Sequence, residues 1–252
     1  IRTYDSYFRD EHAWAMPIVA ETYDGTLNDI NALHVKPEHA IAALDAASTG
    51  PVAEGSVGGG NGMIAYEFKG GTGTASRRVE IGGKTYTIGA LVQANYGRRP
   101  WFTVLGVPVG REMPEGTIRD RDRETGSIIV ILATDAPLLP HQCKRLARRV
   151  TLGLARSGTV SHNGSGDLFL AFSTANAAAL DPDTPPSPAD FLANDRLDPL
   201  FAAVVQATDE AVVDSMVANR AMTGRDGITV QALPHDRVRA LLARHGILRD
   251  IG

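Results

Sequence analysis

The feature that most constrains this chain is the junction at residues 124–132, where a charged loop meets an apolar run. The sequence there is Glu-Thr-Gly-Ser-Ile-Ile-Val-Ile-Leu, with Gly126 and Ser127 directly before the apolar residues. Such a run predicts a buried β-strand that begins at the serine. One interpretation is an ordinary loop-to-strand turn. The other is a self-cleaving nucleophile, because cutting between Gly126 and Ser127 would leave an α-amine beside the serine hydroxyl as its base.

The composition excludes several classes of protein. With 252 residues, the chain has material for one large domain or two small ones. A net charge of −4 without a clustered basic patch argues against nucleic-acid binding. The single cysteine, Cys143, excludes an intrachain disulfide, and we expect it to be packed in a helix. No apolar run approaches membrane-spanning length.

Metal and nucleotide sites are not expected either. The seven histidines lack the spacing that a metal site with a carboxylate partner would need. A glycine-rich turn at residues 58–60 allows close backbone approach, but no Gly-Lys-Ser or Gly-Lys-Thr follows it. We therefore expect no cofactor.

Hydrophobic periodicity predicts strands and helices along most of the chain. Strands are expected at residues 13–23, 63–69, 79–81, 85–94, 101–107, 127–133, 167–174 and 228–230. Helices are expected at residues 37–48, 140–157, 197–217 and 236–245. Residues 108–126 are polar and charged, and they predict an exposed loop that suits a processing site. Strand runs alternating with helix pairs predict a layered α/β sandwich.

Three candidate site residues lie at the ends of predicted strands. Asn95 ends an apolar strand, where its amide could donate to a developing oxyanion, although turn chemistry explains the residue equally well. Ser165 and Asp167 are two positions apart, so both side chains could reach one face and bind the amine or hydroxyl of Ser127. An ordinary tight turn is the alternative for this glycine-framed segment.

A second polar pair, Glu21 and Tyr23, lies in the first predicted strand. The two residues are two positions apart, so both side chains would lie on the same face of the strand. A carboxylate is the direct electrostatic partner of an ammonium group. The alternatives are a solvent-facing glutamate and a half-buried strand aromatic.

Short sequence blocks, in order along nearly the whole chain, match one known family. They lie at residues 20–25, 27–31, 50–60, 62–63, 68–71, 73–77, 92–97, 133–142, 163–167 and 222–227. The first reads Ala-Glu-Thr-Tyr-Asp-Gly and the last Met-Thr-Gly-Arg-Asp-Gly. In these blocks the chain resembles the DmpA-type family of self-processing serine aminopeptidases. That family includes the L-aminopeptidase/D-amidase/esterases and the β-peptidyl aminopeptidases.

The resemblance implies a fold and a division of the chain. The implied fold is the αββα sandwich of the DmpA and ornithine acetyltransferase type. Cleavage would separate an α-subunit-like region, 1–126, from a β-subunit-like region, 127–252, which begins at the nucleophile, and the two would form one domain. Family members usually carry a longer segment before the block that contains Glu21. This chain is therefore expected to lack its N-terminal segment, with any targeting signal.

The resemblance also assigns roles to the candidate residues. Positions that match the family's catalytic network are Ser127 as the nucleophile, Ser165, Asp167, Asn95 and Tyr23. Asn95 and Tyr23 match the oxyanion region, and Glu21 matches the residue that holds the substrate ammonium. Some relatives carry glutamate where this chain has Asp167, which changes the reach of that carboxylate.

Together these observations predict an autoprocessed serine aminopeptidase that acts on short peptides, amino-acid amides or esters. The expected partners are such substrates and further copies of the processed chain, with neither nucleic acid nor membrane. An acyltransferase like the ornithine acetyltransferases is the closest alternative, although those enzymes process before threonine and this chain has Ser127. A non-catalytic truncated fragment is another. We expect a cytoplasmic location, and a periplasmic one stays open.

Overall fold

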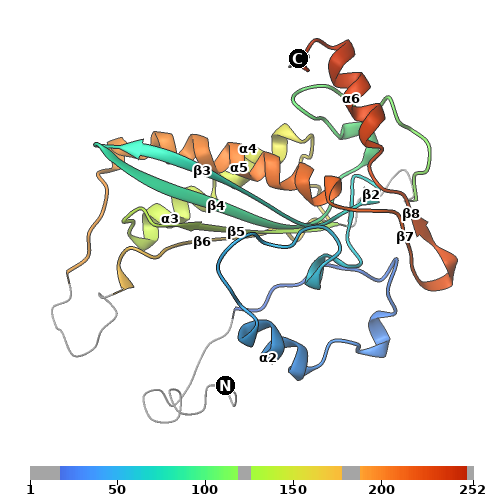
Figure 1. Cartoon of the computed structure of the whole chain (residues 1–252), viewed down its shortest axis with the longest axis horizontal. Coiled ribbons are helices and arrows are strands. Elements are labelled where there is room, and N and C mark those ends of the chain that lie inside the picture. Colours follow the sequence, from blue (N-terminus) through green and yellow to red (C-terminus); the bar gives the residue numbers. More distant parts are fainter. Residues whose placement is uncertain (1–17, 119–125, 178–187, 249–252) are drawn as a thin grey trace.

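A four-stranded sheet is the centre of the fold. The computed structural model describes residues 18–118, 126–177 and 188–248. The sheet consists, in spatial order, of β3 (Gly71–Ile81), β4 (Lys84–Asn95), β5 (Ser127–Thr134) and β6 (Leu168–Ser173). The first three strands are antiparallel neighbours, whereas β6 runs parallel to β5. A parallel pair needs a crossover connection, and the chain between β5 and β6 supplies one that contains two helices. Figure 1 shows the sheet extending across the molecule.

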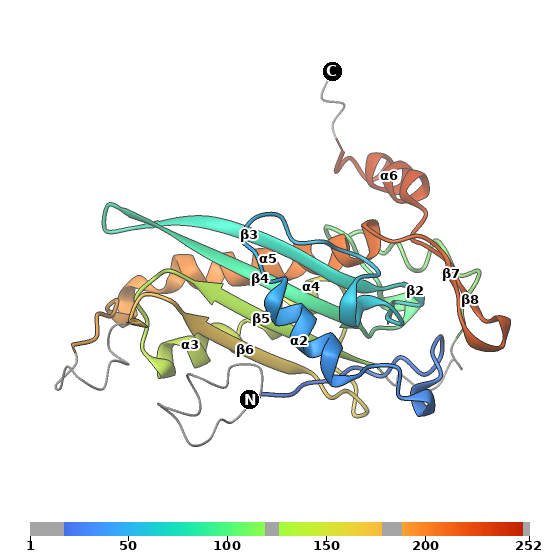
Figure 2. The same ribbon diagram turned by 60° about the horizontal axis from the view of Figure 1, so that its bottom comes forward.

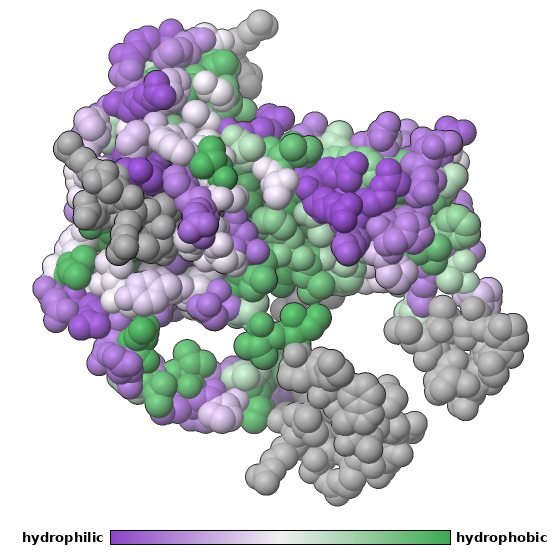
Figure 3. Space-filling view, turned by 180° about the vertical axis from the view of Figure 1, so that it is seen from behind, coloured by the Kyte–Doolittle hydropathy of each residue, from purple (hydrophilic) through white to green (hydrophobic). Residues whose placement is uncertain are grey.

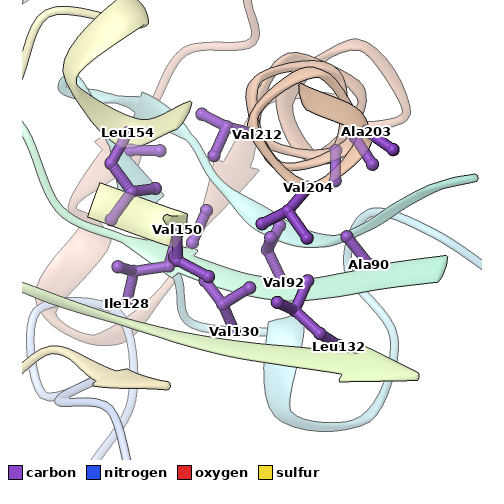
Figure 4. Close-up of a cluster of buried hydrophobic side chains, with 14 of the residues drawn as sticks. Ala90, Val92, Ile128, Val130, Leu132, Val150, Leu154, Ala203, Val204 and Val212 are labelled. Atoms are coloured by element: carbon purple, nitrogen blue, oxygen red, sulfur yellow. The ribbon is translucent and has the colours of Figure 1, made fainter. Parts of the chain in front are cut away.

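Helices cover one face of this sheet. They are α3 (Pro140–Ala147), α4 (Val150–Arg156) and α5 (Asp198–Val217). In Figure 2, α5 lies on the far side of β3 and β4. Figure 4 shows the core between the two layers, where Val92 and Val130 point toward Leu154 and Val204. These four side chains are 0% exposed. Each contributes about 1.5–3 kcal/mol relative to an exposed position.

The opposite face of the sheet has a different pattern of burial. Along β5, the side chains of Ile128, Val130 and Leu132 are buried under the helices, and the residues between them are half-exposed. On β6 the exposed residues are Leu168, Leu170 and Phe172, at 46%, 38% and 43%. This face, called the open face below, carries no packed helical layer in the described part of the chain. Residues 50–52 border it beside Leu91 and Ile131. Ser127, the first residue of β5, points to it.

Smaller elements surround the end of the sheet where β4 ends and β5 begins. They are the hairpin of β1 (Ile64–Ala65) and β2 (Phe68–Lys69), the hairpin of β7 (Met222–Thr223) and β8 (Thr229–Val230), α6 (His235–Arg244) and short 3-10 helices at Ile30–Ala32, Gly58–Gly60, Arg99–Trp101 and Arg225–Gly227. The 3-10 helix Asn194–Arg196 lies at the other end of the sheet, where Gln142 of α3 bonds Asn194. In Figure 2, α2 (Pro37–Asp45) lies in front of β4 and β5. Figure 3 shows an apolar area in the middle of the molecule's rear face, between two more hydrophilic ends. None of the helices in the described ranges is long and apolar enough to cross a bilayer.

Most predicted elements are confirmed, and three strand predictions are wrong. Residues 63–69 form the hairpin of β1 and β2 instead of one strand, because the chain turns at Tyr66 and Glu67, with φ 49° and 63°. Residues 18–23 form no strand, because side chains rather than a ladder of backbone hydrogen bonds hold this segment. Residues 101–107 contain a turn with Leu105 and Gly106 at φ 50° and 81°, and only the isolated bridge of Val104 with Val107 forms. Residues 13–17 of the first predicted strand, and residues 119–125 of the predicted processing loop, lie outside the described residues. Residues 108–118 do form a loop, but it is not exposed throughout, because Val109 and Met113 are buried and Arg99 bonds the Met113 carbonyl oxygen.

The predicted helix at residues 140–157 is two helices. The hydrogen-bond pattern changes at Arg149, whose N–H donates to the carbonyl of Leu146, only three residues back, so that α3 and α4 are separate. Cys143 is buried in α3, which confirms its prediction as a packed residue.

Candidate active site

Ser127 and Asn95 lie directly opposite each other, where β5 begins and β4 ends. In an antiparallel pair, opposite side chains share a face, with Cβ atoms about 4.5–5.5 Å apart. Ser127 is half-exposed on the open face, whereas Asn95 is only 1% exposed. The sheet register thus places the predicted nucleophile beside the predicted oxyanion donor.

Two contacts fix the Asn95 side chain. Its Oδ1 accepts a hydrogen bond from the N–H of Ile64 at 2.9 Å. Its Nδ2 donates to the carbonyl oxygen of Tyr23 at 2.7 Å. A carboxamide nitrogen has two hydrogens. The amide is therefore oriented by one acceptor and one donor contact, and Nδ2 keeps a second hydrogen for another acceptor.

The turn before β6 contacts the Ser127 hydroxyl directly. The N–H of Gly166 donates to Ser127 Oγ at 3.0 Å. A Cβ atom at Gly166 would lie 3.3 Å from the same oxygen, so the glycine permits this close approach. The sequence showed a glycine-framed turn here but did not identify this donor, because a backbone N–H has no residue signature.

Asp167 accepts three hydrogen bonds at this end of the sheet. Ser165 Oγ donates to its Oδ1 at 2.5 Å, and the N–H of Ile128 donates to the same oxygen at 3.1 Å. Ser161 Oγ donates to Oδ2 at 2.9 Å. Because the Ser165 hydroxyl hydrogen is used on Asp167, its oxygen is free to act as an acceptor, for example of an ammonium on Ser127. Sequence reasoning missed Ser161.

The segment that contains Glu21 and Tyr23 lies against the end of β4. Glu21 is solvent-exposed, and Tyr23 is 54% exposed. The tyrosine ring folds over Gly25, where a Cβ atom would lie 2.4 Å from Tyr23 Oη. The contact between Tyr23 and Asn95 is made through the tyrosine carbonyl oxygen. Since these residues are not in a strand, the expected sharing of one strand face does not follow for Glu21 and Tyr23.

Buried hydroxyl groups support the site from behind. Ser157 Oγ lies 3.0 Å from Tyr96 Oη and 2.9 Å from Tyr66 Oη. Burial raises the pKa of Tyr96 well above its ordinary value, so this phenol stays neutral. Tyr96 follows Asn95 in the chain, and its hydroxyl network therefore fixes the end of β4.

The described ranges contain no ready set of metal ligands. No group of three or more His, Cys, Asp or Glu side chains there is arranged to hold a metal ion. What the described residues bring together is a serine hydroxyl, a carboxamide, a serine–aspartate pair and a backbone N–H. This arrangement suits acyl transfer through a serine nucleophile.

The comparison with solved structures shows the fold. The first similar structure is that of the L-aminopeptidase D-Ala-esterase/amidase from Ochrobactrum anthropi, described as a prototype of the serine aminopeptidases with a variant of the Ntn hydrolase fold. It is 49% identical, with a TM-score of 0.92 over 98% of this chain and 69% of that one. A Burkholderia β-aminopeptidase is 45% identical, with a TM-score of 0.85 over 98% of this chain and 70% of its own. The expected α/β sandwich class is confirmed. The described residues supply one helical layer and one sheet of it.

Sequence comparison leads to the same group of proteins. The β-peptidyl aminopeptidase BapA of Sphingosinicella microcystinivorans is 52% identical over 246 residues, which is 92% of this chain. The chain spans 62% and 60% of the lengths of the first two curated relatives that it matches. The family profile described as Peptidase family S58 matches residues 4–230. The chain therefore belongs to Peptidase family S58.

Proposed function

We propose that this chain acts as a self-processing serine aminopeptidase on short peptides, amino-acid amides or esters. The observation that carries the proposal is the position of Ser127, at the start of β5 and opposite Asn95, with its Oγ bonded by the N–H of Gly166. The adjacent Ser165–Asp167 pair supplies an acceptor and a negative charge. Relatives that are described as aminopeptidases support the same reaction.

Self-processing would use the same serine as later turnover. Ser127 Oγ attacks the carbonyl carbon of Gly126, and the acyl group moves from the Ser127 nitrogen to its oxygen. Water then hydrolyses the resulting ester, which leaves a carboxylate on Gly126 and a free α-amine on Ser127. The products are the proposed subunits 1–126 and 127–252.

Turnover would then begin at the new terminus. The α-amine, with a reference pKa of about 8, accepts the proton of Ser127 Oγ as the oxygen attacks the substrate carbonyl. Asn95 Nδ2, together with Tyr23, stabilises the oxyanion, and Ser165 with Asp167 stabilises the ammonium that forms on Ser127. The ammonium returns its proton to the leaving amine, and water hydrolyses the acyl-enzyme.

Recognition of the substrate is assigned to Glu21. An aminopeptidase must bind a free ammonium group, and an exposed carboxylate next to the segment held by Asn95 can pair with it. Glu21 is not part of the proposed chemical steps. Its replacement should therefore affect the choice of substrate and leave self-cleavage unchanged.

Substrate assays distinguish this function from its rivals. The purified intact protein should hydrolyse aminoacyl p-nitroanilides, and Ser127→Ala should not. An acyltransferase would instead move the acetyl group of N-acetylornithine to glutamate. The family match favours the peptidase over this alternative. Acetyl transfer without release of p-nitroaniline would contradict the proposal. So would a lack of turnover both of the aminoacyl p-nitroanilide and of N-acetylornithine with glutamate.

Assembly into a homo-oligomer of processed subunits is part of the same proposal. It is supported by exposed apolar side chains on the edge strand β6, namely Leu168, Leu170 and Phe172. Light scattering of the purified protein would measure the mass of the particle, and a monomer would contradict this part. We also propose a cytoplasmic location, which fractionation of cells would test.

A further inference from the structure

Gln93 holds the segment next to the proposed amine-binding residue. It lies on the open face of β4, two positions before Asn95. Its Nε2 donates a hydrogen bond to Thr22 Oγ1, and Thr22 Oγ1 donates in turn to the buried sulfur of Met63 at 2.9 Å. Asn95 bonds the carbonyl oxygen of the next residue, Tyr23. Two successive open-face side chains of β4 thus hold two successive residues of this segment.

The glycine-rich turn leaves space for the Gln93 carboxamide. An ideal Cβ atom at Gly59 would lie 1.9 Å from Gln93 Oε1 and 2.8 Å from its Cδ. The φ angle of Gly59 is not in the left-handed region, so the backbone there would accept alanine. A Cβ atom there would meet only the end of the flexible Gln93 side chain, which would have to move. Any side chain at Gly59 would push the carboxamide away from Thr22.

A buried lysine fixes the same turn from the other side. Lys69 is 0% exposed, and its Nζ donates to the carbonyl oxygens of Gly60 and Gly70 at 3.1 and 2.6 Å. Gly60 follows Gly59 directly, so this contact limits how far the turn can move away from Gln93. The turn is thus held by Lys69 on one side and packs against the Gln93 carboxamide on the other.

We propose that Gln93 is a positioning residue for substrate-amine recognition. By holding Thr22, it fixes the backbone on either side, which places Glu21 and Tyr23, and Gly59 provides the space for this contact. The inference rests on the proposed function, because Glu21 is assigned there to the substrate ammonium. A neutral hydrogen bond of this kind should be worth roughly three- to tenfold in substrate binding.

Three variants remove the contact through different atoms. Gln93→Ala removes the donor, Thr22→Val the acceptor, and Gly59→Ala the space. Each should raise KM for an aminoacyl p-nitroanilide roughly three- to tenfold, with kcat less affected and a smaller preference for free-amine over N-acetylated substrates. Self-cleavage at Ser127 should stay complete by intact mass.

Two control variants should stay close to the wild type. Thr22→Ser keeps the hydroxyl that Gln93 bonds. Gly89→Ala lies on the same strand as Gln93, where the nearest atom to a new Cβ is the carbonyl oxygen of Ala133 at 3.9 Å. Thermal melting of every variant identifies any that fails to fold, and Thr22→Val then provides the test in place of Gln93→Ala.

The double variant of Gln93→Ala and Glu21→Gln separates positioning from general stability. If Gln93 acts through Glu21, its replacement should change KM little once the carboxylate is gone. If the KM changes of the two single variants multiply fully in the double variant, the inference is overturned. Unchanged KM and substrate preference in Gln93→Ala and Thr22→Val would overturn it as well. If Glu21→Gln itself has no effect, both the assignment of Glu21 and this inference fail. If Glu21→Gln changes recognition but Gln93→Ala does not, the inference fails while the assignment of Glu21 stands.

Discussion

The two faces of the central sheet are built from the same strands but have opposite roles. On β5, Ile128, Val130 and Leu132 point to the helices and are at most 1% exposed. The alternate residues, beginning with Ser127, point to the open face. Cross-strand pairing places Asn95 beside that serine. One face thus supplies rigidity through close packing, while the other presents the polar groups that the rigid strands hold in register.

This division explains why the proposed chemistry lies at a strand end. A polar group inside the helix-covered core would need hydrogen-bond partners for its polar atoms, because an unpartnered polar atom there costs much free energy. At the start of β5, Ser127 is half-exposed, and its Oγ still accepts a hydrogen bond from the Gly166 N–H. The proposed nucleophile is therefore accessible to solvent, and yet it lies on a strand that cannot shift without disturbing the core.

After Ser127→Ala, which should abolish turnover, the largest expected effect on the open face comes from Asn95→Ala. Loss of an oxyanion donor typically lowers kcat about 10²- to 10³-fold, or about 2.7–4 kcal/mol. Steady-state kinetics on an aminoacyl p-nitroanilide would measure the change. A urea titration serves as the control, since the variant also loses the acceptor of the Ile64 N–H. A folded variant with unchanged kcat would remove Asn95 from the oxyanion site.

Neighbouring residues of β5 allow a direct comparison of the two faces. Leu132→Ala, on the covered face, should lower the free energy of unfolding by about 2–4 kcal/mol. Ile131→Ala, on the open face, should cost less, because its side chain is only half-buried in the described structure. Denaturant unfolding of both variants gives the two values. Equal losses would mean that the open face is covered in solution.

Glu21→Gln tests recognition rather than chemistry. A charge-assisted contact contributes about 1.5–3 kcal/mol, so its loss should lower kcat/KM for free-amine substrates roughly ten- to a hundredfold. The gap between free-amine and N-acetylated substrates should narrow, and self-cleavage should stay intact. If self-cleavage is blocked and the substrate preference does not change, Glu21 belongs to processing or structure.

The smallest effect concerns Asp214, a half-buried residue near the end of α5. Its pKa is raised from the ordinary 3.8 to about 6, chiefly by burial and also by the nearby Glu54 and Glu210, while Arg77 lowers it. The pKa of Asp214 is higher in the folded state than in the unfolded state, so the protonated carboxyl group stabilises the fold. This stabilisation is fully present below the unfolded pKa and is lost as pH rises through about 6.

Asp214→Asn should therefore stabilise the protein by about 1 kcal/mol at pH 7, after allowance for solvent screening. The gain should shrink toward zero as the pH falls to about 4. Urea titrations at several pH values would measure it. A gain that does not depend on pH would show that the charge of Asp214 is not its cause.

The covered face could be predicted from the sequence, because its signals are local. The apolar run after Ser127 predicted β5, and the periodicity at residues 197–217 predicted α5. The segment at residues 18–23 was predicted wrongly as a strand. Its apolar residues suggest a ladder, but side chains of β4, distant in the sequence, hold it instead.

The candidate site was only partly open to sequence reasoning. Family blocks indicated the nucleophile and its polar neighbours, and the structure places Ser127, Asn95, Ser165 and Asp167 together. The backbone donor at Gly166 and the hydroxyl of Ser161 could not be found this way. Their contacts depend on how the turn before β6 meets β5, and neither a backbone N–H nor a common serine marks that geometry in the sequence.

The mass of the mature polypeptides tests the central claim most directly. The wild-type protein should give two chains by intact-mass spectrometry, one ending at Gly126 and one beginning at Ser127, and Ser127→Ala should give a single uncut chain. Cleavage of Ser127→Ala at the same bond would assign the cut to an outside protease and contradict the account. A wild-type protein that stays whole while hydrolysing aminoacyl substrates would contradict it as well.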